Sequence, residues 1–359
     1  MITVLVCYER ISLFHTMEPF FRKRFRGMFH FTQSPEYCLK KDKNKILFME
    51  RWFQYRDPRA LASEDFGLMK KLRDKYEKIV FLNGQPDAGT NRLDLLPYVD
   101  RLFYKSVFAD RENYDKGFYG KNLFADYYHR KYGVVDANGG YFFEPALSVE
   151  DANRIELSWN IGVGSYPRRN WPQRLGTVLA RSGFPDLGRC FKAGRTKAPA
   201  DFSGPNRSIA VHARIDPVAS ESISYQRRLY LERISGDQRF LTGMVNQNQY
   251  YRELNDSKIV LSPFGWGEVC FRDFEAIISG ALLLKPDMSH LKTWPDVYIP
   301  YVTYVPVNWD GTDIIEKTET YLADEAERKR ITQNAFEQYQ KELVGLEDRF
   351  AALFRDYLS

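Results

Sequence analysis

Residues 258–286 read KIVLSPFGWGEVCFRDFEAIISGALLLKP, and this stretch decides the fold that we expect. Lys258–Ser262 is a short apolar run with β-branched side chains, which predicts a buried strand. Residues 263–267, PFGWG, favour a turn. Glu268–Ser279 then places apolar side chains at helical spacing, so a helix should follow the turn.

The end of this predicted helix is equally well marked. Gly280 stands where a C-terminal glycine commonly ends a helix. Ala281–Leu284 predicts a second buried strand, which Pro286 should stop. The unit is therefore strand, turn, helix and strand, and a connection of this kind usually gives parallel strands.

The junction between the turn and the helix suits an anionic ligand. The first N–H groups of a helix have no partner and carry partial positive charge, and glycines allow a phosphate to approach the backbone. Arg272 lies one turn into the predicted helix and can add a bidentate bond. Glu275 lies three residues later on the same face, where its carboxylate can accept hydrogen bonds from ribose hydroxyls. The plainer alternative is an ordinary βαβ unit with Arg272 and Glu275 as a surface ion pair.

The segment SPFGWGEVCFRDFEAIISGALLL resembles the donor-binding motif of GT-B glycosyltransferases, most closely the exostosin-like and group-1-like pattern. The resemblance implies two Rossmann-like domains facing a cleft, and it extends more weakly to about Gln340. It implies a nucleotide diphosphate at the loop and helix start, and a nucleotide ribose at Glu275. The full donor-binding set that we expect is Arg214, Gly243, Ser262, Gly265, Trp266, Gly267, Arg272 and Glu275. Many group-1 enzymes carry an earlier Glu for the donor sugar; Gly267 occupies that position here, and Glu268 is one place later.

Composition fits a globular α/β protein of more than one domain. The chain has 359 residues, with 44% hydrophobic and 28% charged side chains, so each half can bury a core. The net charge of +5 suits an anionic substrate or an acidic membrane surface better than nucleic acid. Basic residues cluster at 22–26 and 40–45, which we interpret as solvated surface or as a peripheral membrane contact.

No metal, disulfide or membrane-spanning pattern accompanies this composition. Four cysteines without paired spacing suit a reducing compartment, and no Asp-x-Asp motif follows a strand. The start MITVLVCYER predicts a strand rather than a signal peptide, and no stretch has about 18 apolar residues. We therefore expect a cytoplasmic protein without a bound metal or cofactor.

Strands alternating with helices predict an open parallel sheet in each half. We expect an N-terminal acceptor-side domain at 1–165, a crossover at 166–206 rich in Gly and Pro, and a nucleotide-sugar-binding domain at 207–345. A last helix at 346–359 should be able to pack back on the first domain. Further strands are expected at Lys78–Asn83, 208–214, 239–244 and 298–304.

Ligands of such sheets lie beyond the carboxyl ends of the strands. The loops at Tyr8–His15 and Gly84–Thr90 should therefore face the cleft. Asp87 is the first candidate for a general base, and His212 and Asp216 follow a strand of the second half. Each has a structural alternative, namely a turn aspartate or a buried histidine. Glu9 is a further polar residue near a strand end.

These observations favour a glycosyltransferase that moves a sugar from a nucleotide-activated donor to a carbohydrate or glycolipid acceptor, as in surface polysaccharide synthesis. A non-catalytic nucleotide- or sugar-binding protein of the same fold is the first alternative. A nucleic-acid-binding protein is the second, although no recognised module supports it.

Overall fold

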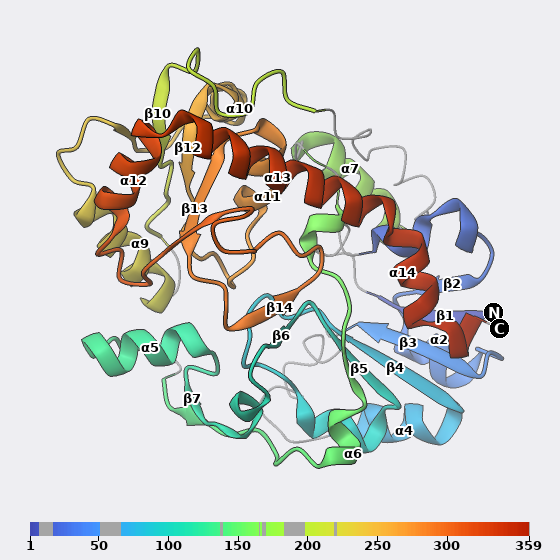
Figure 1. The fold of residues 1–359 in the computed structure, drawn as a ribbon. Helices are drawn as coiled ribbons and strands as arrows, with labels where there is room; N and C mark the ends of the chain where they lie inside the picture. Colours follow the sequence, from blue (N-terminus) through green and yellow to red (C-terminus); the bar gives the residue numbers. More distant parts are fainter. Residues whose placement is uncertain are drawn as a thin grey trace.

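The structure is a computed structural model, and it describes residues 1–6, 17–50, 66–136, 139–164, 166, 170–182, 198–218 and 221–358. The expected loop at Tyr8–His15, including Glu9, and the crossover residues 167–169 and 183–197 lie outside the described residues. Two separate parallel sheets organise the chain, and Figure 1 shows them at opposite ends of the molecule.

The first half builds a six-stranded sheet in the order β2-β1-β3-β4-β5-β9, with all neighbours parallel. The apolar runs are nearly continuous because both faces of the sheet are covered. In β4, Ile79 and Phe81 enter one hydrophobic cluster, while Val80 and Leu82 enter the other. The strands are β1 Ile2–Leu5, β2 Phe29–Thr32, β3 Ile46–Glu50, β4 Lys78–Asn83, β5 Arg101–Tyr104 and β9 Ile155–Leu157.

The second half builds a five-stranded parallel sheet in the order β11-β10-β12-β13-β15. In β12, Ile259 and Leu261 face one cluster and Val260 faces the other, so this strand is buried on both sides as predicted. The strands are β10 Ile209–His212, β11 Phe240–Leu241, β12 Ser257–Leu261, β13 Leu282–Pro286 and β15 Val305–Val307. The expected fold class, two Rossmann-like α/β units in a GT-B arrangement, is confirmed.

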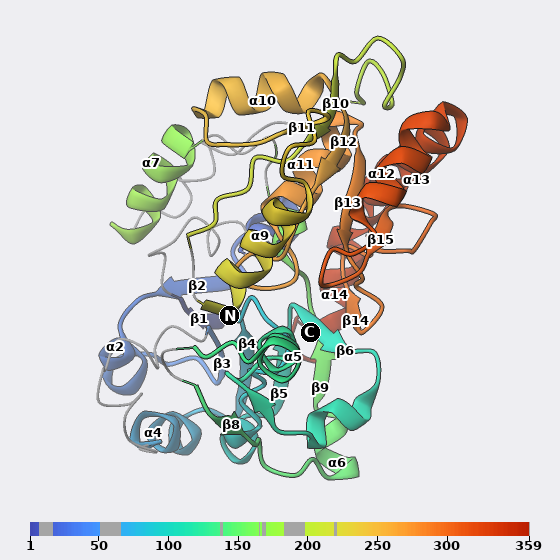
Figure 2. The same ribbon diagram turned by 90° about the vertical axis from the view of Figure 1, so that its left-hand side faces the viewer.

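Helices cover both sheets (Figures 1 and 2). The first half carries α2 Pro35–Lys40, α4 Gly67–Lys75, α5 Leu123–Tyr132 and α6 Val149–Ala152, and α7 Asn170–Arg181 lies in the crossover. It also has 3-10 helices at Glu18–Phe21, Lys23–Phe25, Leu93–Tyr98, Arg111–Asp115 and Ile161–Val163. The second half carries α9 Glu221–Arg233, α10 Gln247–Asn255, α11 Phe271–Ser279, α12 Ile314–Ala323 and α13 Glu325–Val344. None of the described helices is long and apolar enough to cross a bilayer.

Three details differ from the sequence predictions. Helix α11 begins at Phe271 rather than Glu268, because the carboxylate of Asp273 caps the backbone N–H of Cys270. Strand β13 continues through Pro286, which pairs with Val307 in a parallel ladder. The strand expected at 298–304 is instead a series of turns, and the ladder forms only at Val305–Val307.

The two halves contact each other through several of the described elements. Strands β6 Ser106–Phe108 and β14 Leu291–Thr293 pair across the interface. Helix α5 packs on α9. The long helix α13 leads back to the first sheet, where α14 Leu346–Leu353 and α15 Arg355–Leu358 lie over its strands (Figure 1). Their aromatic rings contact those of Phe20, Phe29, Phe48, Phe103 and Trp159. A small hairpin of β7 Phe118–Tyr119 and β8 Tyr141–Phe142 completes the first half.

Candidate functional site

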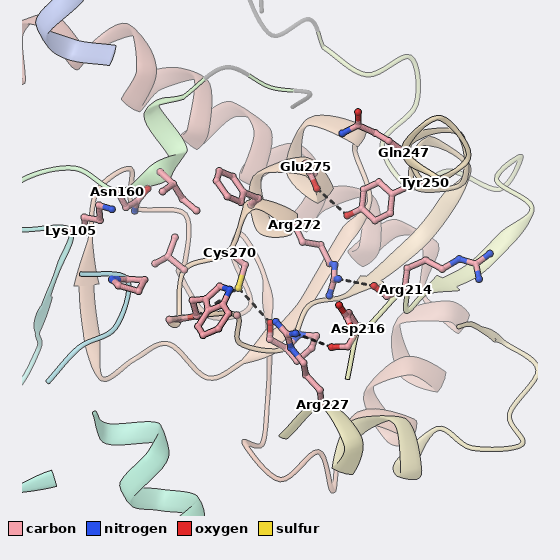
Figure 3. A pocket seen from close by; sticks show the side chains of 18 of the residues that line it. Lys105, Asn160, Arg214, Asp216, Arg227, Gln247, Tyr250, Cys270, Arg272 and Glu275 are labelled. Atoms are coloured by element: carbon pink, nitrogen blue, oxygen red, sulfur yellow. Dashed lines mark hydrogen bonds between the residues drawn. The ribbon is translucent and has the colours of Figure 1, made fainter. Parts of the chain in front are cut away.

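A cavity of about 690 Å³ lies between the carboxyl ends of the two sheets. This volume is typical of small-molecule sites. First-half residues that follow β4, β5 and β9 line one wall, namely Gly84, Lys105 and Asn160. The opposite wall carries residues that follow β10 and β12, together with the start of α11. Figure 3 shows Lys105 and Asn160 on one side, and Arg272 and Glu275 on the other.

The segment 263–270, which we call the glycine loop, is held by a fully buried ion pair. The Nζ of Lys285 lies 3.0 Å from the Oδ2 of Asp273, and neither side chain is exposed. Asp273 also accepts hydrogen bonds from the Ser262 hydroxyl at 2.6 Å and the Tyr298 hydroxyl at 2.6 Å. Because every oxygen of this carboxylate is bonded, the charge is tolerated inside the protein. Ser262 therefore supports the loop from below and is not among the residues lining the cavity.

Gln226 supports the same loop from the side. Its side-chain oxygen accepts a hydrogen bond from the Phe264 N–H at 2.7 Å. Its amide nitrogen donates to the hydroxyl of Tyr128, at 2.6 Å, on helix α5 of the first half. The hydroxyl of Tyr128 in turn donates to the Trp309 carbonyl. Helix α5 of the first half thus helps to hold the interface between the halves.

The glycine loop also touches the first half directly. A Cβ on Gly267 would lie 1.8 Å from the carbonyl oxygen of Pro86, so only glycine fits there. The next residue, Glu268, is fully buried, and its Oε2 accepts a hydrogen bond from the Ala88 N–H at 3.1 Å. Glu268 is therefore committed to this contact and does not line the cavity.

Two guanidinium groups face the cavity beside the start of α11. The Nη2 of Arg272 donates to the Arg214 carbonyl at 2.7 Å, while its buried Nε has no partner among the described residues. The Nη1 of Arg227 donates to the Asp216 carbonyl at 2.8 Å. Burial lowers the pKa of Arg227 because the charged form loses water. An anion between these groups would restore the lost solvation.

Arg227 and Arg228 are neighbours on α9 but have different surroundings. Helix α9 lies with Arg227 toward the cavity, while Arg228 remains exposed near Glu221. Neighbouring helical residues point about 100° apart, so only the packing of α9 against the glycine loop decides which arginine is inside.

Glu275 is held in the cavity wall by two tyrosines of α10. Its Oε2 accepts from the Tyr250 hydroxyl at 3.0 Å (Figure 3). Its Oε1 accepts from the Tyr251 hydroxyl at 2.7 Å. Burial and the nearby carboxylate raise the pKa of Tyr250, so this residue remains a donor. A carboxylate has about four acceptor positions, which leaves room for ligand hydroxyls.

Arg214 is among the residues lining the cavity, and its guanidinium is bound to Glu253 and Thr242. Its Nε and Nη2 form a bidentate pair with Glu253, at 2.8 and 2.7 Å, and Nη1 donates to the Thr242 carbonyl. Figure 3 shows this side chain directed away from Arg272 and Cys270. Gly243 lies beside it, since a Cβ there would be 3.5 Å from Nη1 of Arg214. The structure thus turns the Arg214 guanidinium, with Gly243 beside it, away from the arginine pair in the cavity.

The three candidate bases have different environments. Asp216 lines the cavity, and its Oδ1 accepts from the Val218 N–H at 2.9 Å. His212 is fully buried, and burial together with Arg272 lowers its pKa to about 3, so the ring is neutral. Asp87 accepts from the Thr90 hydroxyl at 2.9 Å in a turn, and its neighbour Pro86, rather than Asp87 itself, lines the cavity.

Several cavity residues were not predicted. Lys105 and Asn160 follow strands β5 and β9, and the strand-end rule pointed to this edge without selecting these side chains. Within the described ranges, no group of three or more His, Cys, Asp or Glu side chains has a geometry that fits a metal ion.

Comparison with known proteins agrees with this geometry. Residues 217–352 match the family model described as glycosyl transferase-like. The matched segment lies in the second half of the chain and is similar to that family. No curated protein matches the chain in sequence.

Solved structures give distant likenesses to this chain. TarM is 10% identical with a TM-score of 0.47, over 89% of this chain and 57% of TarM. Anabaena HepE in complex with UDP and glucose is also 10% identical at a TM-score of 0.47, over 99% of both chains. A UDP-forming trehalose-phosphate synthase from Burkholderia vietnamiensis is 13% identical at a TM-score of 0.43, over 89% and 76%. At such identities none of these proteins identifies a substrate for this chain.

Proposed function

We propose that this protein is a glycosyltransferase that takes a nucleoside diphosphate sugar as its donor. One observation supports this most directly: a buried carboxylate, Glu275, and two cavity-facing guanidiniums, Arg272 and Arg227, share one cavity beside a helix start. The carboxylate suits ribose hydroxyls, and the guanidiniums and the partial positive charge of the helix start suit a diphosphate.

The order of these groups matches the order of groups in such a donor. Glu275, Tyr250 and Gln247 lie at one end of the cavity, and Cys270 and Arg227 lie nearer its middle (Figure 3). Lys105 and Asn160 form the far wall, which belongs to the first half. The donor would therefore lie with its nucleoside on the second half and its sugar toward the first half.

The positive charges in the cavity would stabilise the nucleoside diphosphate as a leaving group. A leaving nucleoside diphosphate gains negative charge as the glycosidic bond breaks, and fixed positive groups stabilise that charge. Arg272, Arg227 and the first N–H groups of α11 would serve this role, so the proposal needs no metal or cofactor. Asp216 is the first candidate for the general base because it lines the cavity, and Asp87 is the second.

We propose a carbohydrate or glycolipid acceptor, with surface polysaccharide synthesis as the setting and the cytoplasm as the location.

Exposed basic residues at 22–26 and 40–45 support a peripheral contact with an acidic membrane. Some of these charges are paired, as in Lys40 with Glu36 at 2.8 Å and Arg24 with Asp348 at 2.6 Å. Sedimentation with phosphatidylserine vesicles, against phosphatidylcholine vesicles and across a salt series, tests this contact. Equal sedimentation with both lipids would contradict it.

A non-catalytic nucleotide- or sugar-binding protein is the second candidate. It is favoured by the position of His212 and Asp87 outside the cavity lining, which leaves Asp216 as the single lining residue among the three predicted bases. Donor hydrolysis without acceptor separates the two functions, because a binding protein would leave the nucleotide sugar intact.

A thermal-shift screen of nucleoside diphosphates and their sugars tests the proposal. A ligand that binds only the folded protein raises the melting temperature, by an amount that grows with concentration above Kd. We expect one nucleotide family to raise it in the parent protein and less in Glu275→Ala. If no nucleotide changes the melting temperature at millimolar concentration, the donor assignment is wrong.

A further inference from the structure

Trp266 is the most exposed large ring at the cavity, and its exposure needs a reason. The residue is 68% exposed although it lines the cavity. An indole is costly to hold in water, and large exposed apolar groups at a cleft commonly contact a ligand. Its ring has no aromatic or cationic contact with the described residues. The ring is therefore available on at least one face.

The backbone of Trp266 is fixed even though its ring is exposed. Gly265 N–H donates to the Gly267 carbonyl at 2.9 Å, which closes the turn around Trp266. Gly267 in turn lies against Pro86 of the first half, where a Cβ would not fit. The indole is thus presented at the seam between the two halves by a pre-organised turn, which lowers the entropy cost of binding.

The first-half wall supplies a polar partner for the same ligand. Asn160 is 1% exposed, and its Nδ2 has no hydrogen-bond partner among the described residues. Its orientation is set, because Oδ1 accepts from the Gly162 N–H at 2.8 Å and its backbone N–H donates to the Trp294 carbonyl at 2.7 Å. A buried donor left without a partner in a cavity wall points to a ligand oxygen. Ser106 lines the same wall and adds a hydroxyl.

We infer that Trp266, Asn160 and Ser106 form the acceptor subsite, and that it takes a pyranose ring. A pyranose carries a flat patch of C–H groups that can lie on the face of an indole, while its rim hydroxyls reach the amide and the serine. An open-chain polyol has the same hydroxyls but no preformed apolar face. The inference rests on the proposed function, since it uses the donor's direction in the cavity to assign this wall to the acceptor.

The assignment to the acceptor follows from the position of the donor groups. Glu275 anchors the nucleoside end at the opposite end of the cavity, and Arg272 and Arg227 take the diphosphate between them. With the ribose at Glu275, the sugar end of the donor points toward the first-half wall that carries Asn160. The space beside Trp266 is then left for the donor sugar and the acceptor sugar.

Saturation-transfer NMR on the full chain tests the inference. The probes are methyl β-D-glucopyranoside and methyl β-D-galactopyranoside, with D-sorbitol as the open-chain comparison, each measured with and without the nucleoside diphosphate that gives the largest thermal shift. We expect ring C–H signals from at least one pyranoside and none from sorbitol. Trp266→Ala should weaken binding of that pyranoside about tenfold, and Trp266→Phe should restore most of the saturation-transfer signal. Trp171→Ala is the matched control, because Trp171 is 76% exposed on α7 and lies outside the cavity lining.

Other outcomes would overturn the inference. Sorbitol binding equal to the pyranosides, or no pyranoside signal at all, would exclude a ring-specific subsite. Loss of nucleotide-sugar affinity in Trp266→Ala, with nucleoside diphosphate affinity and pyranoside signals unchanged, would place the indole on the donor sugar instead. Failure of every nucleotide in the thermal screen would refute the proposed function, whereas nucleotide binding without a Trp266 effect refutes the subsite alone.

Discussion

Gly267 of the second half lies against Pro86 of the first half so closely that a Cβ on Gly267 would meet the Pro86 carbonyl oxygen at 1.8 Å. The same turn carries Trp266 at the cavity and leads into Glu268, which bonds the Ala88 N–H. The shape of the donor loop therefore depends on the seating of one half on the other. The contact that brings the two halves together therefore also fixes the conformation of the glycine loop.

Replacing Gly267 tests this contact. We expect Gly267→Val to destabilise the protein by about 1–3 kcal/mol, because a side chain forces the two backbones apart. Nucleoside and nucleoside diphosphate affinities should then fall together. Denaturant unfolding and calorimetric titration measure both effects. Gly345→Ala is the control, since a Cβ there has no neighbour closer than 3.6 Å. Unchanged stability with a selective loss of diphosphate binding would show that the glycine serves the phosphates instead.

Arg227 and Arg228 form a natural matched pair. Arg227→Ala should weaken nucleoside diphosphate binding by roughly 1.5–3 kcal/mol, the range for a hydrogen bond to a charged group, and should make binding less sensitive to salt. Arg228→Ala should leave affinity unchanged, because Arg228 is exposed on the other side of α9. Titrations at two salt concentrations measure this. Equal effects of the two substitutions would rule out a direct phosphate contact by Arg227.

Glu275 should determine recognition of the ribose. We expect Glu275→Gln to weaken nucleotide binding by about 1–3 kcal/mol through loss of charged acceptors. A 2′-deoxynucleotide should bind the parent protein less tightly than the matching ribonucleotide does. Glu275→Gln should lower the affinity for the 2′-deoxynucleotide only a little further. Tyr251→Phe removes one hydrogen bond to Glu275 and should have a smaller effect. If Glu275→Gln binds as tightly as the parent, the ribose lies elsewhere.

Turnover should depend more on Asp216 than on Asp87. Asp216→Asn keeps the size of the side chain and removes its basicity, so turnover should fall about 100- to 10,000-fold while donor affinity stays near the parent value. Asp87→Asn should reduce turnover less, because Asp87 accepts a hydrogen bond from Thr90 and does not line the cavity. Product formation and donor titration measure the two quantities. The reverse order of losses would make Asp87 the base, as the sequence first suggested.

His212 should make stability depend on pH. Its pKa is lowered to about 3 in the folded protein, against about 6.5 in the unfolded chain, so the unfolded chain binds the proton more readily between these values. Its contribution to stability is complete above pH 6.5 and is lost as pH falls toward 3, by up to about 1.4 kcal/mol per pH unit. His212→Phe should flatten the unfolding free energy between pH 6.5 and 4.5. An unchanged slope in this variant would mean that other groups dominate.

The sequence alone determined the local architecture around residues 258–286. Apolar runs and helical spacing predicted the strand, the helix and the second strand, and the left-handed Gly280 ends α11 as expected, with φ of 71°. The spacing of Arg272 and Glu275 also placed both on one helix that faces the cavity. Such features follow from backbone geometry and side-chain periodicity within a few residues, which is why they can be predicted without the tertiary structure.

Tertiary packing decided which of these features serve the site. Arg227 faces the cavity because α9 lies against the glycine loop, and Arg214 is turned away because Glu253 binds it. Gly267 is required by Pro86, a residue of the other half. Periodicity defines the faces of an element but not what those faces meet. The residues that come into contact are distant in the chain. Only the packed fold therefore brings the Gly267–Pro86 contact, the arginine pair and the exposed Trp266 together.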